Sequence, residues 1–253
     1  YIASITQSET MPESIASKAF MKALYGEHPY GLPSSGEVKS IKKINKKDLQ
    51  DFYKNNYLSN ELSVVIVGDI SRAEAEDLAY KISAGFPENK RDKVIPLVNY
   101  NKPQDIKISH PSKQAHLYYG APIIKRGDPD FLTLYLGNYI LGGGGFVSRL
   151  TQEIRENRGL AYSVYSYFMP YIEVGPFQIG IQTKKDQVNE AKKIIKKTVS
   201  EFIKNGPSPN ELKRAKDFMI GGFPLRLDSN KSILAYVSMM AFYKYPLDYL
   251  ETF

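Results

Sequence analysis

The hydrophobic and polar positions of the first hundred residues follow helical spacing, interrupted by one apolar run. Apolar residues recur three and four positions apart in three stretches, which predicts helices over 12–25, 45–57 and 71–86. The second and third of these helices open with the residue pattern of a capping box. Between them, an apolar run at 62–67, rich in β-branched residues and ended by Gly68, predicts a buried strand.

The remaining residues predict a second block in which strands and helices are mixed. We expect strands over 105–111, 115–122, 162–171 and 175–183. We expect helices over 128–142, 146–157, 186–206 and 208–219. The last two strands alternate apolar and polar residues with period two, so they should pair as antiparallel neighbours.

The order of these elements predicts an α+β fold. The stretch 87–104 is polar and punctuated by prolines, and within it we place a linker at 96–104. The linker divides the chain into a first domain at 1–95 and a second at 105–253. The first residues carry no export signal and the last ones read as the middle of a helix, so we expect a fragment of a longer protein.

The composition is that of an ordinary globular protein, with 253 residues of which 42% are hydrophobic and 24% charged. The absence of cysteine excludes disulfides and thiolate metal sites, and it suits any compartment, including an oxidising one. No apolar run reaches the roughly 18 residues that a membrane-spanning helix needs. No G-x-G-x-x-G or Walker A motif lies between a predicted strand and helix, which removes the main support for a nucleotide-binding fold.

The formal net charge is +7, and the lysines form modest clusters at 39–47 and 192–197. Such clusters are either solvated helix faces or a surface for nucleic acid or another polyanion. No basic motif interleaved with aromatic residues is present, so we expect no nucleic-acid partner.

The three histidines give no recognisable zinc site. His28 follows Glu27, which matches the end of H-x-x-E-H, but the first position of that motif is Leu24, which cannot bind metal. His110 and His116 read as turn or strand residues. We therefore assign no metal ligand in this chain. It also has neither a G-x-S-x-G elbow nor a cysteine nucleophile.

The predicted helix that begins at Phe146 carries the strongest candidate for chemistry. Phe146, Leu150 and Ile154 form its apolar stripe, and Arg155 lies in its last turn. Tyr162 begins the next strand, seven residues after Arg155, so a chain reversal brings its hydroxyl near the guanidinium. Two such donors suit a carbonyl oxygen that gains negative charge during attack. The alternative is a helix-end arginine beside a half-buried strand tyrosine.

Four consecutive glycines precede this helix: Gly142, Gly143, Gly144 and Gly145. Glycine permits positive φ angles and the close approach of another backbone. The run is therefore either a tight connection between two helices or a flexible loop that touches an extended peptide. The residues alone favour the tight connection.

Several segments resemble, in the same order, blocks of the insulinase/pitrilysin-type zinc metallopeptidases. They are KALYGEHPYGLPSSGE, FYKNNYLSNELSVVIVGDI, LGNYILGGGGFVSRLTQEIRENRGLAYSVYS and GPFQIGIQT, and the resemblance covers nearly the whole chain. The zinc motif of that family is an inverted H-x-x-E-H, which this chain lacks. Glu9 and Glu13 are the carboxylates nearest to where active members place a further zinc ligand, and neither matches it. The pattern is closer to bacterial members that have lost the zinc motif and work beside an active partner.

The resemblance implies repeated α+β domains, each a sheet covered by helices, as in mitochondrial processing peptidase. Residues 1–95 would be the end of the first repeat and 105–253 most of the second. The resemblance also implies that Arg155 and Tyr162 contact the substrate carbonyl and that Gly142–Gly145 handle substrate. Peptides of this family add as an extended strand to a sheet edge.

The leading interpretation is a non-catalytic half or subunit of a zinc metalloendopeptidase, inactive alone. Its partners would be an extended peptide and a zinc-bearing half or subunit that supplies the metal, its water and the general base. The alternative is a structural or peptide-binding module of the same fold with no peptidase role. We expect a periplasmic location, with the cytoplasm as the alternative.

Overall fold

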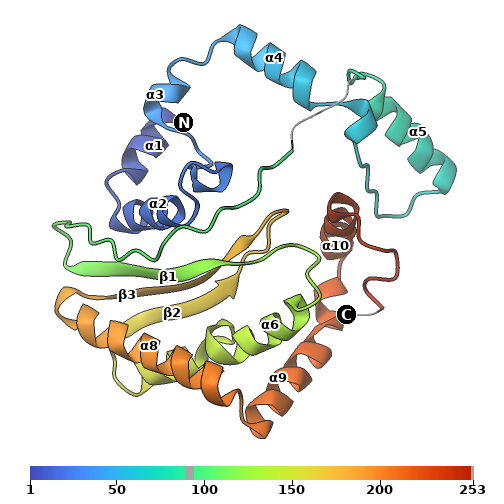
Figure 1. Ribbon diagram of the computed structural model, residues 1–253. Helices are drawn as coiled ribbons and strands as arrows, with labels where there is room; N and C mark the ends of the chain where they lie inside the picture. The colour runs from blue at the N-terminus through green and yellow to red at the C-terminus, as the bar shows by residue number, and fades with distance from the viewer. Residues whose placement is uncertain (89–93, 252–253) are drawn as a thin grey trace. The chain divides into compact units, whose positions relative to one another are not determined.

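The computed structural model describes residues 1–88 and 94–251, and Figure 1 shows its helices and strands. By their contacts the residues form two compact units, which are described one at a time. The first unit comprises Tyr1–Val38 and Ile95–Phe218, and the second comprises Lys39–Val94 and Met219–Phe253. The repeat boundaries proposed at residues 95 and 105 stay a prediction.

A three-stranded antiparallel sheet organises the first unit. Its strands are β1 (Gln114–Ile124), β2 (Ala161–Phe168) and β3 (Gly175–Lys184), in the spatial order β1-β3-β2. β3 therefore lies in the centre and is buried along most of its length, whereas β1 and β2 are edge strands. The pairing of β2 with β3 confirms the antiparallel neighbours predicted for 162–171 and 175–183.

Helices pack on both faces of this sheet (Figure 1). The helices and helical turns of the unit are α1 (Ile2–Ser8), α2 (Pro12–Tyr25), η1 (Pro29–Gly31), α6 (Phe131–Asn138), η3 (Tyr139–Gly143), η4 (Gly145–Val147), α7 (Arg149–Thr151), η5 (Gln152–Glu156), η6 (Lys185–Gln187), α8 (Val188–Asn205) and most of α9 (Pro209–Gly222). α8 covers one face, and α2 packs against β1, where the rings of Phe20 and Tyr118 lie 5.7 Å apart. This arrangement confirms the predicted α+β class.

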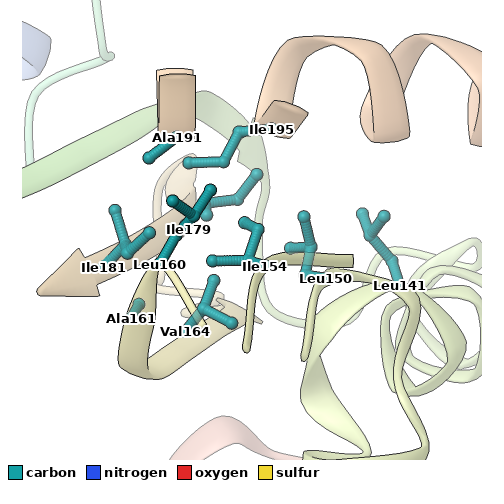
Figure 2. Close-up of a cluster of buried hydrophobic side chains, with 10 residues drawn as sticks. All are labelled: Leu141, Leu150, Ile154, Leu160, Ala161, Val164, Ile179, Ile181, Ala191 and Ile195. Carbon is teal, nitrogen blue, oxygen red and sulfur yellow. The ribbon is translucent and has the colours of Figure 1, made fainter. Parts of the chain in front are cut away.

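The core of the first unit lies between α8, β3 and the segment that leads from η3 into β2. Figure 2 shows ten buried apolar side chains that point toward one another. They are Leu141, Leu150, Ile154, Leu160, Ala161, Val164, Ile179, Ile181, Ala191 and Ile195. Burial of this apolar surface is the main favourable contribution to folding of the unit.

The sequence of α8 encodes its part of this core. Ala191, Ile195 and Thr198 recur four and three positions apart, so they form one buried stripe on the helix. Gly206, with φ of 66°, ends the helix as predicted, since glycine adopts this conformation without a steric penalty.

The second unit is helical in the residues that the structure describes. It contains α3 (Val38–Ile41) from its second residue, α4 (Lys46–Asn56), η2 (Ser59–Glu61), α5 (Arg72–Ser83), the end of α9, η7 (Pro224–Leu227) and α10 (Asn230–Tyr243). Capping boxes at Asn45 and Ser71 open α4 and α5, as the sequence predicts. The last described residues, 247–251, form turns, so the helix expected at the end of the chain is not found there.

Two segments predicted as strands are irregular in the structure. The β-branched run 62–67 and the run 105–111 pair with none of the three described strands. Both predictions are wrong because β-branched composition shows only that residues would suit a sheet. A strand also needs backbone hydrogen bonds to a neighbouring strand, and neither segment has one among the described residues. The predicted linker 96–104 contains no helix or strand, and residues 89–93 of the polar stretch 87–104 lie outside the described residues.

An ion pair joins α7 to α9 within the first unit. Arg149 Nε and Nη2 donate to the two carboxylate oxygens of Glu211, each at 2.7 Å, and Nη2 also donates to the Gly206 carbonyl at 3.0 Å. Glu211 also accepts from the amide and hydroxyl of Ser208, at 2.8 and 2.7 Å, and its own amide donates to the Ser208 hydroxyl, which forms a capping box at the start of α9. These bonds, above all those from Arg149, lower the pKa of Glu211 to about 2.

Replacing a buried side chain of α8 tests the core. Ile195→Ala is expected to lower the free energy of unfolding by about 2–5 kcal/mol, because it removes buried methyl groups and leaves a cavity. Ile203 lies on the same helix but is 78% exposed, so Ile203→Ala should change this free energy by less than about 0.5 kcal/mol. Urea unfolding followed by circular dichroism measures both variants. Equal losses would contradict the assignment of the buried face.

The Glu211 carboxylate predicts a pH dependence of stability. Because its folded pKa lies below its unfolded value, its stabilisation is complete above about pH 5 and is lost as the pH falls toward 2. Its side chain is 23% exposed, so we expect Glu211→Gln to cost on the order of 2 kcal/mol at pH 7 and much less near pH 2. Asp217, which forms an exposed ion pair with Lys213, provides a control. Asp217→Asn should leave the dependence of the unfolding free energy on pH nearly unchanged. Urea unfolding at several pH values measures the difference.

Candidate functional site

The segment that carries Arg155 is not the single α-helix predicted over 146–157. It consists of the 3-10 turn η4, one turn of α7 and the π-helical turn η5, which holds Arg155. The preceding helix also differs from the prediction over 128–142. Asp128 Oδ1 accepts a hydrogen bond from the Asp130 amide at 3.0 Å and closes a turn, so α6 begins only at Phe131 and then continues into the π-helical turn η3.

The chain reversal after η5 brings Arg155 and Tyr162 side by side. Gly159, with φ of 61°, turns the chain, and its amide donates to the Arg155 carbonyl at 2.9 Å. The Leu160 amide donates to the Ile154 carbonyl at the same distance. The central carbon of the Arg155 guanidinium then lies 5.0 Å from the centre of the Tyr162 ring. The two residues are therefore adjacent, but the contact is between the cation and the aromatic ring, and the predicted approach of the Tyr162 hydroxyl to the guanidinium stays a prediction.

Tyr162 sits in a β-bulge of the edge strand β2. Ala161 pairs with Thr183 and Ser163 pairs with Gln182, so Tyr162 is an additional residue with no partner opposite it in β3. A bulge changes the direction in which a side chain leaves the strand. The side chain of Tyr162 is 83% exposed, rather than half-buried as the alternative interpretation requires.

The predicted apolar stripe of this segment is correct for two of its three members. Leu150 and Ile154 are fully buried, whereas Phe146 is 60% exposed because it lies in η4 instead of on a continuous helix. Its ring centre is 4.5 Å from the guanidinium carbon of Arg155. Sequence reasoning missed this contact, and the signal for it was an aromatic residue placed directly after a glycine run.

The three arginines of this segment differ in their partners. Arg149 and Arg158 donate hydrogen bonds to carboxylates, of Glu211 at 2.7 Å and of Glu153 at 2.6 Å. Arg155 Nε forms only a longer ion pair, with the Glu156 carboxylate at 3.5 Å, and among the described residues its guanidinium makes no hydrogen bond. The N–H groups of Arg155 can therefore donate to a ligand.

Three of the four glycines are required by close packing. A Cβ on Gly142 would lie 2.3 Å from the Ser166 hydroxyl, and Cβ atoms on Gly143 and Gly144 would meet Asn138 and the Tyr139 carbonyl at 2.6 Å each. Gly142–Gly144 therefore form the tight connection that the residues favoured. Gly145 differs, since it has φ of 59° and open space around its Cβ position.

A groove of about 550 Å³ lies between this connection and the edge strand β2. Its lining residues are Tyr135, Asn138, Tyr139, Gly142, Gly143, Gly145, Val164, Tyr165, Ser166 and Tyr167. The lining contains four tyrosines and no charged side chain. Asn138 closes part of the strand edge, because its side chain donates to the Ser166 carbonyl at 3.0 Å and accepts from the Ser166 hydroxyl at 2.6 Å.

None of the three histidines lines this groove, and two of them, His28 and His110, accept hydrogen bonds from nearby backbone amides. His28 Nδ1 accepts from the Tyr30 amide at 3.1 Å and its Nε2 lies 2.8 Å from the Pro96 carbonyl oxygen, while His110 Nδ1 accepts from the Ser112 amide. Within residues 1–88 and 94–251, no three His, Cys, Asp or Glu side chains come together as a metal site. The residues of this chain that the structure describes therefore do not fit a zinc ion.

Among the described residues, no helix has both the length and the apolar character needed to cross a bilayer.

The packing of Gly142 gives a testable consequence. Gly142→Ala is expected to lower the free energy of unfolding by about 1–3 kcal/mol, because the new methyl group collides with Ser166 and Leu150. Gly221 on α9 has no atom within 4 Å of its Cβ position, so Gly221→Ala should be neutral or raise stability by about 0.5–1 kcal/mol. Thermal and urea unfolding compare the two. If Gly142→Ala changed the free energy of unfolding no more than Gly221→Ala, the close approach of Gly142 to Ser166 would be contradicted.

Comparison with known proteins gives consistent matches. A family model described as the peptidase M16 inactive domain matches residues 43–219. The "Non-peptidase homolog YmxG" of Helicobacter pylori is 30% identical over 253 residues, covering 99% of this chain and 58% of the relative. The "Uncharacterized zinc protease YmxG" of Bacillus subtilis is 28% identical over 232 residues, covering 90% of this chain and 55% of the relative. The chain thus spans little more than half the length of these relatives.

A solved structure is similar in fold and in sequence. The peptidase M16 inactive domain from Pseudomonas fluorescens matches with a TM-score of 0.94 and 38% identity, covering 99% of this chain and 60% of that one. Sheet, helices and their connections are therefore shared with that domain across nearly all residues of this chain.

Proposed function

The chain belongs to the peptidase M16 inactive-domain family, and on that premise we propose that it is the non-catalytic half or subunit of a zinc metalloendopeptidase. Its family membership agrees with the resemblance read from the sequence. The observation that supports the proposal is the pair of Arg155, which is partly exposed, and Tyr162, which is exposed, on the reversal into β2. Among the described residues the Arg155 guanidinium has one ion pair, with Glu156 at 3.5 Å, and no hydrogen bond.

Arg155 and Tyr162 would act as hydrogen-bond donors to the carbonyl of the bond that is cleaved. As the carbonyl oxygen gains negative charge, the cation and the phenol stabilise it more than they stabilise the uncharged substrate. Since no three His, Cys, Asp or Glu side chains come together among the described residues, the proposal assigns the metal and the general base to another half or subunit. When bound there, zinc would supply the Lewis acid and the nucleophilic water. Closure of the two halves would exclude bulk solvent.

The groove beside β2 would hold the peptide in an extended conformation. β2 is an edge strand, and such an edge offers backbone groups to which a peptide adds as a further strand. On the opposite wall, Gly142, Gly143 and Gly145 add no side chains beside those of Tyr135, Asn138 and Tyr139. Gly145 is the last lining residue of one segment and Val164 the first of the other. In the sequence, Phe146 directly follows Gly145, and Tyr162 lies two residues before Val164. Substrate binding and carbonyl stabilisation would thus share one edge.

A structural or peptide-binding module without a peptidase role is the second candidate. Two observations favour it: the Helicobacter pylori relative is named a non-peptidase homolog, and Asn138 already occupies part of the β2 edge. The two candidates differ in whether Tyr162 contributes to turnover.

We also propose a periplasmic location, with the cytoplasm as the alternative. A chain without cysteine is suited to an oxidising compartment, where free thiols would react.

Substitution of the pair tests the proposed function. In the full-length protein purified with its zinc-bearing half or subunit, Tyr162→Phe is expected to lower kcat/KM for a randomised, internally quenched fluorescent peptide by about tenfold or more, since it removes one donor to the oxyanion. Arg155→Lys should lower it as well, because lysine lacks the planar fork of donors.

Matched controls come from residues of the same type. Tyr80 is an exposed tyrosine of the second unit, and Arg158 is paired with Glu153, so Tyr80→Phe and Arg158→Lys should leave turnover unchanged. Unchanged turnover with Tyr162→Phe in a proteolytically active complex would overturn the proposal. A complex with no activity, but with peptide affinity, would establish the peptide-binding module instead.

A further inference from the structure

Phe146 is an aromatic side chain that the core does not use and that contacts the candidate site. Its ring centre lies closer to the Arg155 guanidinium carbon than the ring of Tyr162 does, at 4.5 Å compared with 5.0 Å. We infer that Phe146 is a positioning residue, which holds the Arg155 guanidinium by a cation–π contact and leaves its N–H groups directed at substrate. The substrate part of this inference rests on the proposed function, whereas the contact does not.

The backbone around Phe146 fixes the position of its ring. Gly145 enters the turn with φ of 59°, a conformation that disfavours other residues. The Ser148 amide and hydroxyl both donate to the Gly145 carbonyl, at 3.1 and 2.8 Å, and Gln152 Nε2 donates to the Phe146 carbonyl at 2.6 Å. The fourth glycine, which packing does not require, therefore serves to present Phe146 on an ordered turn.

The exposure of Phe146 supports this role. Leu150 and Ile154, which follow Phe146 at helical spacing, are fully buried, whereas Phe146 itself is 60% exposed. The core therefore begins one turn after Phe146 and does not include its ring. A large exposed aromatic ring gives up the free energy of burial. Here the ring covers a cation instead, and an aromatic face over a guanidinium is attractive even near water.

A ring suits this task better than a carboxylate would. An arginine side chain has much rotational freedom, and ordering it before substrate arrives reduces the entropy lost on binding. A carboxylate partner would order the side chain but would occupy its N–H groups and cancel its charge, as Glu211 does for Arg149. Contact with the face of an aromatic ring leaves both the donors and the charge available.

The first experiment observes the Arg155 side chain directly. In the full-length protein labelled with ¹⁵N-arginine, Arg155→Lys assigns the Nε–Hε signal of Arg155 by its disappearance. Phe146→Ala and Phe146→Leu are expected to shift this signal downfield and to lower its order parameter, because both remove the ring. Phe146→Tyr should restore both values. Val147→Ala is the matched control, since Val147 is the next residue in the same exposed turn and should change neither.

The second experiment measures turnover in the complex with the zinc-bearing half, using the same quenched peptide. Phe146→Leu is expected to lower kcat roughly two- to fivefold with little change in KM, the fold-change that an exposed cation–π contact supplies. Phe146→Tyr should recover the wild-type value, and Val147→Ala should retain it.

The outcomes separate this inference from the proposed function. An Arg155 signal that is the same in wild type, Phe146→Leu and Phe146→Ala would overturn the positioning role, whatever the turnover. An altered signal with unchanged kcat in Phe146→Leu, while Tyr162→Phe is impaired, would overturn the substrate part of the inference and leave the proposed function standing. If Tyr162→Phe is unimpaired, the proposed function fails, and the Arg155 signal still decides the positioning role. Since Phe146 is exposed, its variants are expected to fold, and urea unfolding checks this.

Discussion

Burial of Leu150 and Ile154 beneath α8 is the constraint on which the candidate site depends. These two side chains fix the segment from α7 to η5 against Ile195 and the sheet (Figure 2). The next residue after Ile154 is Arg155, which therefore leaves the segment in another direction and stays partly exposed. Close-packed interiors permit little adjustment, so residues with no chemical role determine where the guanidinium lies.

The other side of the site is the edge of β2, which the structure covers in part. β2 is protected by the packed glycine connection and by the reciprocal bonds of Asn138 with Ser166, so part of its edge is closed and part borders the groove. The close approach needed for this closure explains Gly142, which faces Ser166. Two π-helical turns occur in this region, η3, which includes Gly142 and Gly143, and η5, which holds Arg155, and such turns recur at functional sites.

The sequence predicted those features that depend on local chemistry. The capping boxes of α4 and α5, the end of α8 at Gly206 and the pairing of β2 with β3 follow from short patterns, and the structure has them. The run 62–67 shows the limit, because its composition gives no information on whether a partner strand is present. The proximity of Arg155 to Tyr162 was predictable because only a short turn separates them, whereas the roles proposed for them rest on the family resemblance. Phe146 was not recognised as part of the site, because periodicity alone assigns it to the apolar stripe and the break of the helix into three turns is a tertiary effect.

The arginines of this segment show how the same side chain is given different tasks by its partners. Arg149, bound by both oxygens of Glu211, has its charge compensated and joins two helices. Arg155 instead contacts two aromatic rings, whose quadrupoles attract a cation without accepting its hydrogen bonds. A compensated arginine has little to offer a developing negative charge, because its carboxylate partner would repel that charge at short range. Ring contacts add no such repulsion, and the one carboxylate paired with Arg155 among the described residues, that of Glu156, lies further away, at 3.5 Å. The choice of partner, rather than the choice of arginine, therefore distinguishes Arg155, which we propose as a donor to an oxyanion, from Arg149, which joins two helices.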